Sequence, residues 1–366
     1  MTPLTPRQRY RAIMDYGPFD RLPVWYFGLW RETEERWRRE GWREGQSIAA
    51  ATGMDEDWEA GMWEAHGLVK VSPISPEPSA VLEETDDYRV VRTPLGAVLK
   101  EGKRASSIPQ HLAEALGPTR ESWARFKRFL DPADPARRPA GWEAAADALG
   151  RRERVTTFLA GSLYGWPRGW LGTEGISFLP YDDPALFEEI LEHLAEYFMA
   201  LYRPVLSRAQ FDFAYFFEDC CFNNGPLFSP EIYRKFYHRH YRRMIDFYHS
   251  AGVPFVLVDS DGRVDDLLPC WLESGFDIVF PIEVGTWRAS PAEFRRRYGK
   301  RMRMLGGVNK LVIPKGEAAI RAELSPLREL VAEGGCIPIP DHRIPPDCSL
   351  EQFRTYVRVF REVFRR

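Results

Sequence analysis

The sequence has few cysteines, and none of them forms a C-x-x-C pair. Their number is odd, which argues against a framework of disulfide bonds. Two of them are adjacent in the chain and follow an acidic pair, and we interpret these two as packing residues because no His–Cys dyad is visible. The cysteines are Cys220, Cys221, Cys270, Cys336 and Cys348.

The sequence also lacks an excess of charge of either sign. Its 50 Lys and Arg residues against 53 Asp and Glu residues leave a net charge of −3, which provides no electrostatic footprint for a nucleic acid. The basic clusters at 36–43 and 295–301 alternate with apolar residues, as the solvated faces of helices do. We therefore expect no nucleic-acid partner.

Long apolar runs are missing as well. No run reaches the roughly 18 residues of a membrane-spanning helix, and the start MTPLTPRQRYRAIMDYG is too polar for a signal peptide. Apolar residues make up 44% and aromatic residues 14% of the chain, which is typical of a soluble globular protein with a sizeable core. We expect a cytoplasmic protein without a membrane partner.

The second half of the chain has a clear β-α-β-α rhythm. Ser229-Pro230-Glu231 is typical of a helix start, and the predicted helix ends near Gly252, where the apolar run VPFVLV begins. The runs FDIVFP, RMRMLGG and CIPIP follow later predicted helices. Continuous apolar strands suit a parallel sheet that is covered on both faces. The sequence therefore predicts the α/β class, with a (β/α)8 barrel or a doubly wound sheet.

The first half contributes two further predicted strands, RLPVWYFG at 21–28 and VTTFLAG at 155–161. Between them, residues 88–102 place Pro-Leu-Gly between apolar stretches, a pattern typical of an antiparallel hairpin. We interpret residues 85–108 as a hairpin insertion into a barrel. Because no repeat and no low-complexity linker is present, we expect a single domain over residues 1–366.

Reactive side chains follow directly after the predicted strands of the rhythmic half. They are Glu218 and Asp219 after FDFAYFF, Asp259 and Asp261 after PFVLV, Glu283 after DIVFPI, Asn309 and Lys310 after MLGGV, and Asp341 and His342 after CIPIP. The carboxyl ends of the strands of a parallel barrel meet at one face, and barrel enzymes keep their active sites there. We therefore expect the side chains of Asp259, Asp341 and His342 to line one pocket.

Each of these residues also has a structural interpretation. An aspartate before a glycine at a strand end is a common turn residue, so Asp259 or Asp261 alone is as consistent with a turn as with catalysis. Lys310 follows two glycines, but their spacing is not that of a phosphate-binding loop. The recurrence of polar residues at five strand ends favours a functional site.

Several motifs in order along the chain resemble the uroporphyrinogen decarboxylase superfamily, which also contains corrinoid-dependent and coenzyme M methyltransferases. They are DRLPVWYF, TRESWARFKRFLDP, GPLFSPEIYRKFYHRHYRRMIDFYHSAG, VDSDG, SGFDIVFPIE, LGGVNK and GGCIPIPDHRIPPD. The resemblance covers nearly the whole chain and is most specific from about residue 216 to residue 365. It implies a (β/α)8 barrel, or TIM barrel, with its site at the carboxyl ends of the strands.

The departures from the superfamily's patterns indicate a divergent branch with DSDG and DH-x-x-PP motifs. The Arg-Gln-Ala-Gly-Arg loop that grips propionates in the decarboxylases is replaced by VWYFGLWRETEERW. Methyltransferase members hold zinc with a His-x-Cys pair and a later cysteine; here Asp259-x-Asp261 and His342 occupy those places. His342 also corresponds to a histidine of the decarboxylases, so it does not choose between the two branches.

The resemblance to this branch does not supply a reaction. Our hypothesis is a methyltransferase-type enzyme that moves a methyl group from a small methylated or methoxylated substrate toward a corrinoid on a separate protein, with no covalently bound cofactor. The expected catalytic residues are Asp259, His342, Glu218 and Asp219. The expected substrate-binding residues are Asp261, Glu283, Asn309, Lys310, Asp341, Trp25 and Tyr26.

The residues at the places of the zinc ligands could bind a divalent metal, either zinc or a harder ion. Asp259, Asp261 and His342 would hold it, and both aspartates reach one ion only if the chain turns at Ser260, which Gly262 permits. The alternative is that these groups bind the substrate without a metal.

Two other functions stay open at this point. One is a cofactor-free decarboxylase of a carboxylated substrate other than uroporphyrinogen, with a carboxylate and His342 as general acids. The other is a non-catalytic barrel that binds a small molecule. The sequence is compatible with a homodimer.

Overall fold

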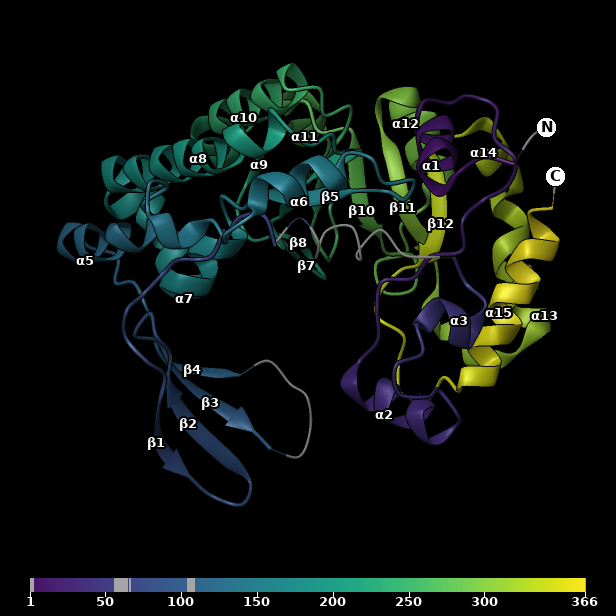
Figure 1. Ribbon diagram of the computed structural model, residues 1–366, viewed down its shortest axis with the longest axis horizontal. Coiled ribbons are helices and arrows are strands. Elements are labelled where there is room, and N and C mark those ends of the chain that lie inside the picture. Colours follow the sequence, from purple (N-terminus) through teal and green to yellow (C-terminus); the bar gives the residue numbers. More distant parts are fainter. Residues whose placement is uncertain (1–2, 56–64, 66, 104–108, 366) are drawn as a thin grey trace.

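The computed structural model describes residues 3–55, 65, 67–103 and 109–365. Its largest sheet has six parallel strands in the order β12-β11-β10-β9-β6-β5 (Figure 1). The strands are β5 (Thr157–Gly161), β6 (Phe213–Phe217), β9 (Val256–Asp259), β10 (Ile278–Ile282), β11 (Arg303–Val308) and β12 (Cys336–Pro340). The predicted α/β class and parallel sheet are confirmed, and so is the strand predicted at 155–161.

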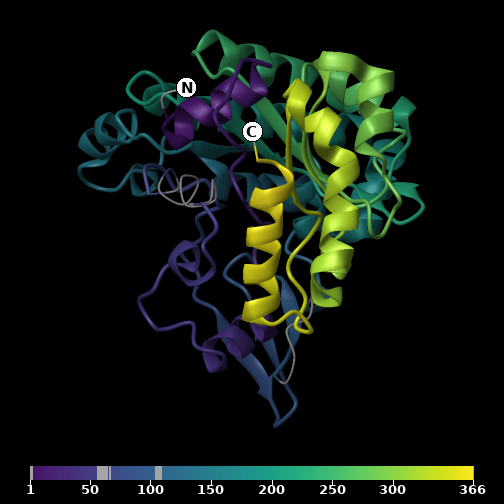
Figure 2. The same cartoon turned by 90° about the vertical axis from the view of Figure 1, so that its right-hand side faces the viewer.

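The sheet is buried because helices cover it. Every residue of β9, β10 and β12 is buried, as their continuous apolar sequences require. Figure 2 shows the C-terminal helix α15, in yellow, beside α13. The helices of this part are α8 (Pro184–Leu206), α9 (Pro230–Ile232), α10 (His238–Ser250), α11 (Leu268–Ser274), α12 (Pro291–Tyr298), α13 (Glu317–Leu324), α14 (Arg328–Glu333) and α15 (Leu350–Val363).

The predicted helix start at Ser229 is confirmed. Its hydroxyl accepts a hydrogen bond from the backbone N–H of Ile232, which satisfies a donor that has no partner within the helix. The helical segment continues from α9 through a π-helical stretch, Tyr233–Tyr237, into α10 and ends at Ser250. The start and the end therefore follow the signals in the sequence.

The strand predicted at 21–28 is not formed, and this prediction was wrong. The nearest strand-like contact is a single parallel bridge between Leu29 and Ile344. Val24 is fully buried, which explains why this stretch of the sequence is apolar. Its N–H donates to the Asp55 carboxylate, and its carbonyl accepts a hydrogen bond from the Asp55 N–H, so neither group pairs with a strand. The segment is thus apolar because it packs in the core, without belonging to a ladder of strands.

The remaining helices and short strands lie mainly in the first half of the chain. They are α1 (Pro6–Met14), α2 (Arg31–Arg39), α3 (Ile48–Thr52), α5 (Arg120–Phe126), α6 (Trp142–Leu149), α7 (Gly165–Asp182), β7 (Cys221–Phe222) and β8 (Gly225–Pro226). None of the helices in the described ranges is both long and apolar enough to cross a membrane.

A second sheet of four antiparallel strands projects from the body of the protein (Figure 1). Its strands are β1 (Ala80–Glu84), β2 (Tyr88–Arg92), β3 (Val98–Gly102) and β4 (Gln110–Ala113). The predicted hairpin corresponds to β2 and β3, which pair across the turn at 93–97. Part of the predicted insertion, residues 104–108, lies outside the described residues, and its interpretation as an insertion into a barrel stays a prediction.

Helix α7 is interrupted at Gly172, where φ is 71° and ψ is 168°. The interruption leaves the carbonyl of Trp170 to accept a hydrogen bond from the N–H of Leu116, at 2.9 Å. The carboxylate of Glu114 occupies the space beside Gly172, where an added Cβ would lie 2.5 Å from its Oε1. The segment after β4 is therefore docked onto the break in α7.

We predict that Gly172→Ala destabilises the protein by about 1–3 kcal/mol, because an L side chain at this φ is strained and meets Glu114. The measurement is unfolding in urea. Gly169→Ala is the matched control: an added Cβ there has no atom within 4 Å, so this variant should be unchanged or up to about 1 kcal/mol more stable. Equal stability of the two variants would contradict the prediction.

Candidate active site

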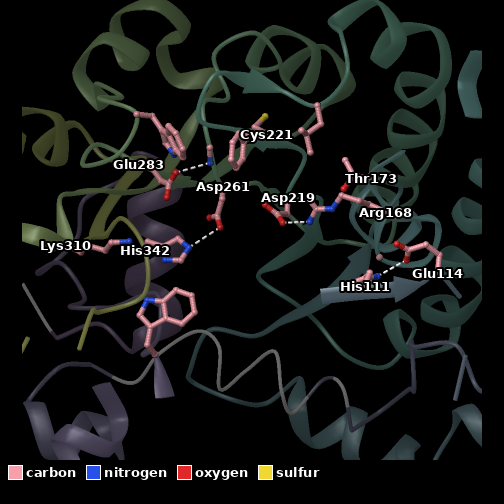
Figure 3. A pocket seen from close by; sticks show the side chains of 17 residues that line it. His111, Glu114, Arg168, Thr173, Asp219, Cys221, Asp261, Glu283, Lys310 and His342 are labelled. Carbon is pink, nitrogen blue, oxygen red and sulfur yellow. Dashed lines mark hydrogen bonds and ion pairs between the residues drawn. The ribbon is translucent and has the colours of Figure 1, made fainter. Parts of the chain in front are cut away.

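A cavity of about 720 Å³ lies at the carboxyl ends of the parallel strands (Figure 3). Five of the residues predicted from strand ends line it: Asp219, Asp261, Glu283, Lys310 and His342. Other lining side chains come from elsewhere in the chain, among them Trp30, His111, Glu114, Arg168, Thr173, Cys221, Phe222 and Trp287. The strands thus bring residues together that are up to 123 positions apart, from Asp219 to His342.

Asp261, Glu283 and His342 form a compact group, which we call the acidic cluster. One possible ligand atom from each residue lies within 4.8 Å of those of the other two. The Nε2 atom of His342 is 3.1 Å from Oδ2 of Asp261, and Oε2 of Glu283 accepts a hydrogen bond of 3.0 Å from the N–H of Gly262. The cluster is therefore held both by side-chain contacts and by the backbone.

Two polar atoms of the acidic cluster are buried without a hydrogen-bond partner among the described residues. They are Oδ1 of Asp261 and Nδ1 of His342. Buried polar atoms in native proteins nearly always have a partner, so these two atoms are available to a water, an ion or a ligand. The cluster thus combines carboxylate and imidazole groups with unused hydrogen-bonding capacity, as a binding site does.

Aromatic rings orient the imidazole of His342. The Trp30 ring stacks on it, with centroids 5.9 Å apart and an interplanar angle of 29°, and Phe27 meets it edge-on at 5.0 Å. These contacts fix the plane of the imidazole, so its two nitrogens point in defined directions.

The surroundings of Glu283 favour its protonated form. Its side chain is buried, and burial, together with the negative charges of Asp261 and Asp341, raises its pKa to about 8, although the hydrogen bond from Gly262 opposes the shift. A neutral carboxylic acid in a cavity can donate a proton to a bound molecule. A metal ion at this position would instead displace the proton.

The two aspartates of VDSDG diverge, and only Asp261 belongs to the acidic cluster. Asp259 is the last residue of β9, is 4% exposed, and accepts a hydrogen bond from the Tyr215 hydroxyl. The chain then turns: Gly262 has φ of 90°, and an added Cβ there would lie 2.7 Å from the backbone of Cys221. The bend at Gly262 directs Asp261 toward the cavity and leaves Asp259 in the sheet.

Asp341 is a buried anchor for neighbouring loops. One of its carboxylate oxygens accepts hydrogen bonds from the N–H groups of Val284 and Gly285, at 3.0 and 2.7 Å. The other accepts from the N–H of Lys310 at 3.0 Å. Its own N–H donates to the carbonyl of Val308. The structure therefore places His342 on the cavity wall and Asp341, its neighbour in sequence, behind it.

Asn309 and Lys310 begin a short 3-10 helix and face different surroundings. The Asn309 side chain accepts a hydrogen bond from the N–H of Leu311, which caps the helix. The side chain of Lys310 lines the cavity on the same side as Glu283 and His342 (Figure 3). Its positive charge is near enough to Glu283 to oppose the rise in that residue's pKa.

Glu218 is buried behind the opposite side of the cavity. Its carboxylate accepts hydrogen bonds from the N–H groups of Leu163, Tyr164 and Gly165, at 3.0, 2.7 and 3.2 Å, just where α7 begins. Burial raises its pKa to about 7, and these hydrogen bonds oppose the shift. Glu218 therefore positions the start of α7 and does not line the cavity.

Asp219, the next residue, lines the cavity and forms an ion pair with Arg168 of α7. Strand-end reasoning missed Arg168, since it lies on a helix. Trp25 and Tyr26, the expected aromatic residues, pack elsewhere: Trp25 contacts Tyr10 in the core, and Tyr26 contacts Phe353. The ring that lines the cavity from this segment is Trp30, in the same sequence motif.

A comparison with protein-family models identifies the family to which the chain belongs. The model described as "Uroporphyrinogen decarboxylase (URO-D)" matches residues 169–363, more than half of the chain. The chain belongs to the uroporphyrinogen decarboxylase family. A comparison with curated protein sequences found no match.

Two solved structures are similar to this member of the uroporphyrinogen decarboxylase family. A methyltransferase from Methanosarcina mazei has a TM-score of 0.59 at 14% identity, over 98% of this chain and 99% of that one. A B12-independent methionine synthase from Shewanella sp. W3-18-1, in complex with selenomethionine, has a TM-score of 0.41 at 11% identity, over 62% of this chain and 66% of that one. Because the sequence identity to the first structure is low, the likeness shows a shared fold alone.

The uroporphyrinogen decarboxylase family match contains the whole acidic cluster, Asp219 and Lys310. It begins one residue after Arg168. Trp30, His111 and Arg168, which also line the cavity, lie outside the matched range.

We predict that Glu283→Gln stabilises the protein more at pH 8 than at pH 5 in the presence of a chelator. A glutamate with a pKa near 4.3 when unfolded and about 8 when folded keeps its proton only in the native state, so stability falls as pH rises between these values. Glutamine carries no such proton. Melting temperatures of variant and wild type across this range measure the difference.

The control for this experiment is Glu329→Gln, at an exposed position of α14. Its melting temperature should differ from that of the wild type by the same small amount at both pH values. A difference between Glu283→Gln and the wild type that does not grow with pH would contradict a neutral Glu283.

Proposed function

We propose that this chain is a methyltransferase-type enzyme, which takes a methyl group from a small methylated or methoxylated compound and passes it toward a corrinoid on a separate protein. The observation that best supports this function is the acidic cluster, with its buried unpartnered atoms, in a cavity at the carboxyl ends of the strands. Membership of the uroporphyrinogen decarboxylase family and the fold shared with a methyltransferase are consistent with it.

We further propose that residues 1–366 form a single (β/α)8 barrel with residues 85–108 inserted into it. Six parallel strands alternating with helices support this architecture. All the groups assigned to chemistry then lie at the one face where barrel enzymes keep their active sites.

The acidic cluster fits a divalent metal ion. Two carboxylates and one imidazole within 4.8 Å of one another suit zinc and harder ions, and three protein ligands leave positions open for a substrate. A metal held by Asp261, Glu283 and His342 would act as a Lewis acid on the heteroatom that carries the methyl group. In this arrangement Glu283 is ionised.

Without a metal, the same residues supply acid catalysis. When the methyl group is transferred, the heteroatom that held it keeps the electron pair of the broken bond and takes up a proton. The neutral carboxyl group of Glu283 donates that proton, and Asp261 orients the imidazole of His342 through their 3.1 Å contact. The two uses of Glu283 exclude each other, so metal binding distinguishes them.

A second candidate, a cofactor-free decarboxylase, is favoured by one observation: neutral Glu283 and cationic Lys310 line the same side of the cavity. Lys310 would bind the substrate carboxylate. When carbon dioxide leaves, the carbon atom keeps the electron pair of the broken bond, and Glu283 would protonate it. This reaction requires no second protein.

We predict methyl transfer to free, chemically reduced cobalamin from at least one compound in a panel of methyl ethers, thioethers and methylamines, followed by cobalamin absorbance. His342→Ala should lower the rate by about a hundredfold or more. Asp246→Asn, on the exposed face of α10, should leave it unchanged.

The decarboxylase would be supported, and the methyltransferase contradicted, by release of carbon dioxide from a carboxylated panel without cobalamin. Uroporphyrinogen is a separate control. We expect no coproporphyrinogen from it, because its several carboxylates need cationic anchors, and the acidic cluster would repel them.

We also predict that the chain binds a divalent ion through the acidic cluster. After treatment with a chelator and dialysis, titration calorimetry with Zn²⁺, Mn²⁺ and Mg²⁺ should show binding by the wild type, weakened at least tenfold in Asp261→Ala and His342→Ala. Asp259→Asn is the matched control, because Asp259 contacts Tyr215 and does not line the cavity. If no ion binds, or if Asp259→Asn is as damaging as Asp261→Ala, the metal site is wrong.

A further inference from the structure

The cavity has two chemically different sides. Figure 3 shows Asp261, Glu283, Lys310 and His342 on one side, and Asp219 with Arg168 on the other. Lys310 and Arg168 are the lysine and arginine side chains that line this cavity within the described chain. Each side therefore carries one basic side chain, and the side opposite the acidic cluster has none of the groups to which the proposed methyl transfer was assigned.

We propose that Arg168 binds an acidic group of the substrate, so that the reacting atom at the other end of the molecule lies at the acidic cluster. The binding of an acidic group at Arg168 stands independently of the reaction, whereas the placement of the reacting atom rests on the proposed function.

The guanidinium of Arg168 has unused donors. Its Nη2 donates to Oδ2 of Asp219, and within the described residues this is its only hydrogen bond. A guanidinium has five N–H donors in a planar fork, which matches the two oxygens of a carboxylate or the oxygens of a phosphate or sulfonate. The Arg168 side chain is 26% exposed, so a molecule in the cavity can reach it.

The backbone at Asp219 is held in an unusual conformation. Its φ is 42°, in the left-handed region that few residues other than glycine, asparagine and aspartate adopt. Its N–H donates to the carbonyl of Asp259 at 3.0 Å, which ties the loop to β9. Such conformations persist where the surroundings enforce them, and they cluster at functional sites. Asp219 therefore acts as a positioning residue for the guanidinium.

Acidic side chains on this side of the cavity already have partners, which favours an anionic over a cationic ligand. Asp219 pairs with Arg168, and Glu114 contacts Nδ1 of His111 at 2.8 Å. On this side of the cavity, Arg168 is the group whose N–H donors outnumber the acceptors that they contact among the described residues. Thr173, which follows the break in α7, adds a hydroxyl group to the same side.

Titration calorimetry on the full chain in chelator, with benzoate and its neutral counterpart benzamide as probes, tests this site. We expect the wild type to bind benzoate about tenfold or more tightly than benzamide, because hydrogen bonds to a charged group contribute strongly. Arg168→Gln should abolish this preference, and Arg168→Lys should retain part of it, since the charge remains without the fork. Arg234→Gln, whose exposed partner is Glu273, is the matched control and should behave as the wild type.

Equal affinity of the wild type for both probes, no binding of benzoate, or a preference that survives Arg168→Gln would overturn the assignment. A preference lost only in Lys310→Gln would place the acidic group beside the acidic cluster and would likewise overturn it, while leaving the methyltransferase proposal intact. If benzoate selectivity depends on Arg168 but no methyl transfer occurs, the reaction is wrong and the binding site stands. Melting curves of each variant verify folding.

Discussion

The buried carboxylate of Asp341 is the interaction on which the reactive side of the cavity depends. It accepts three backbone N–H bonds from the segments that follow β10 and β11, while its own N–H is bonded to the end of β11. The loops that carry Glu283, Lys310 and His342 are thereby fixed to one another. A buried carboxylate without these donors would be costly, so the loops and the carboxylate stabilise each other.

Glu218 has the same function on the opposite side. Its carboxylate accepts hydrogen bonds from the N–H groups of Leu163, Tyr164 and Gly165, where the chain enters α7, and the helix places Arg168 at the cavity. At two strand ends, therefore, one acidic residue faces inward to hold the backbone, and its neighbour in sequence, Asp219 or His342, faces the cavity. This division of labour explains why acidic residues are so frequent at the ends of these strands.

The sequence was sufficient to predict the parallel sheet and the concentration of polar groups at one of its edges, because apolar runs and helix caps are local signals. It could not separate Asp261 from Asp259, or His342 from Asp341, because which side chain faces the cavity depends on a turn and on hydrogen bonds to distant loops. Arg168 lies on a helix, outside the strand-end pattern, and its place is set by tertiary contacts alone.

The residues that line the cavity come from different stretches of the chain. The acidic cluster lies within the segment that matches the family, whereas Arg168 and the segment docked on the break at Gly172 precede it. Asp219, the ion-pair partner of Arg168, and Thr173 lie inside the matched segment, so the side of the cavity that carries Arg168 is built from both stretches. A chimaera that exchanged the earlier stretch between relatives would therefore have to keep a carboxylate at position 219 for its arginine, because the ion pair spans the junction.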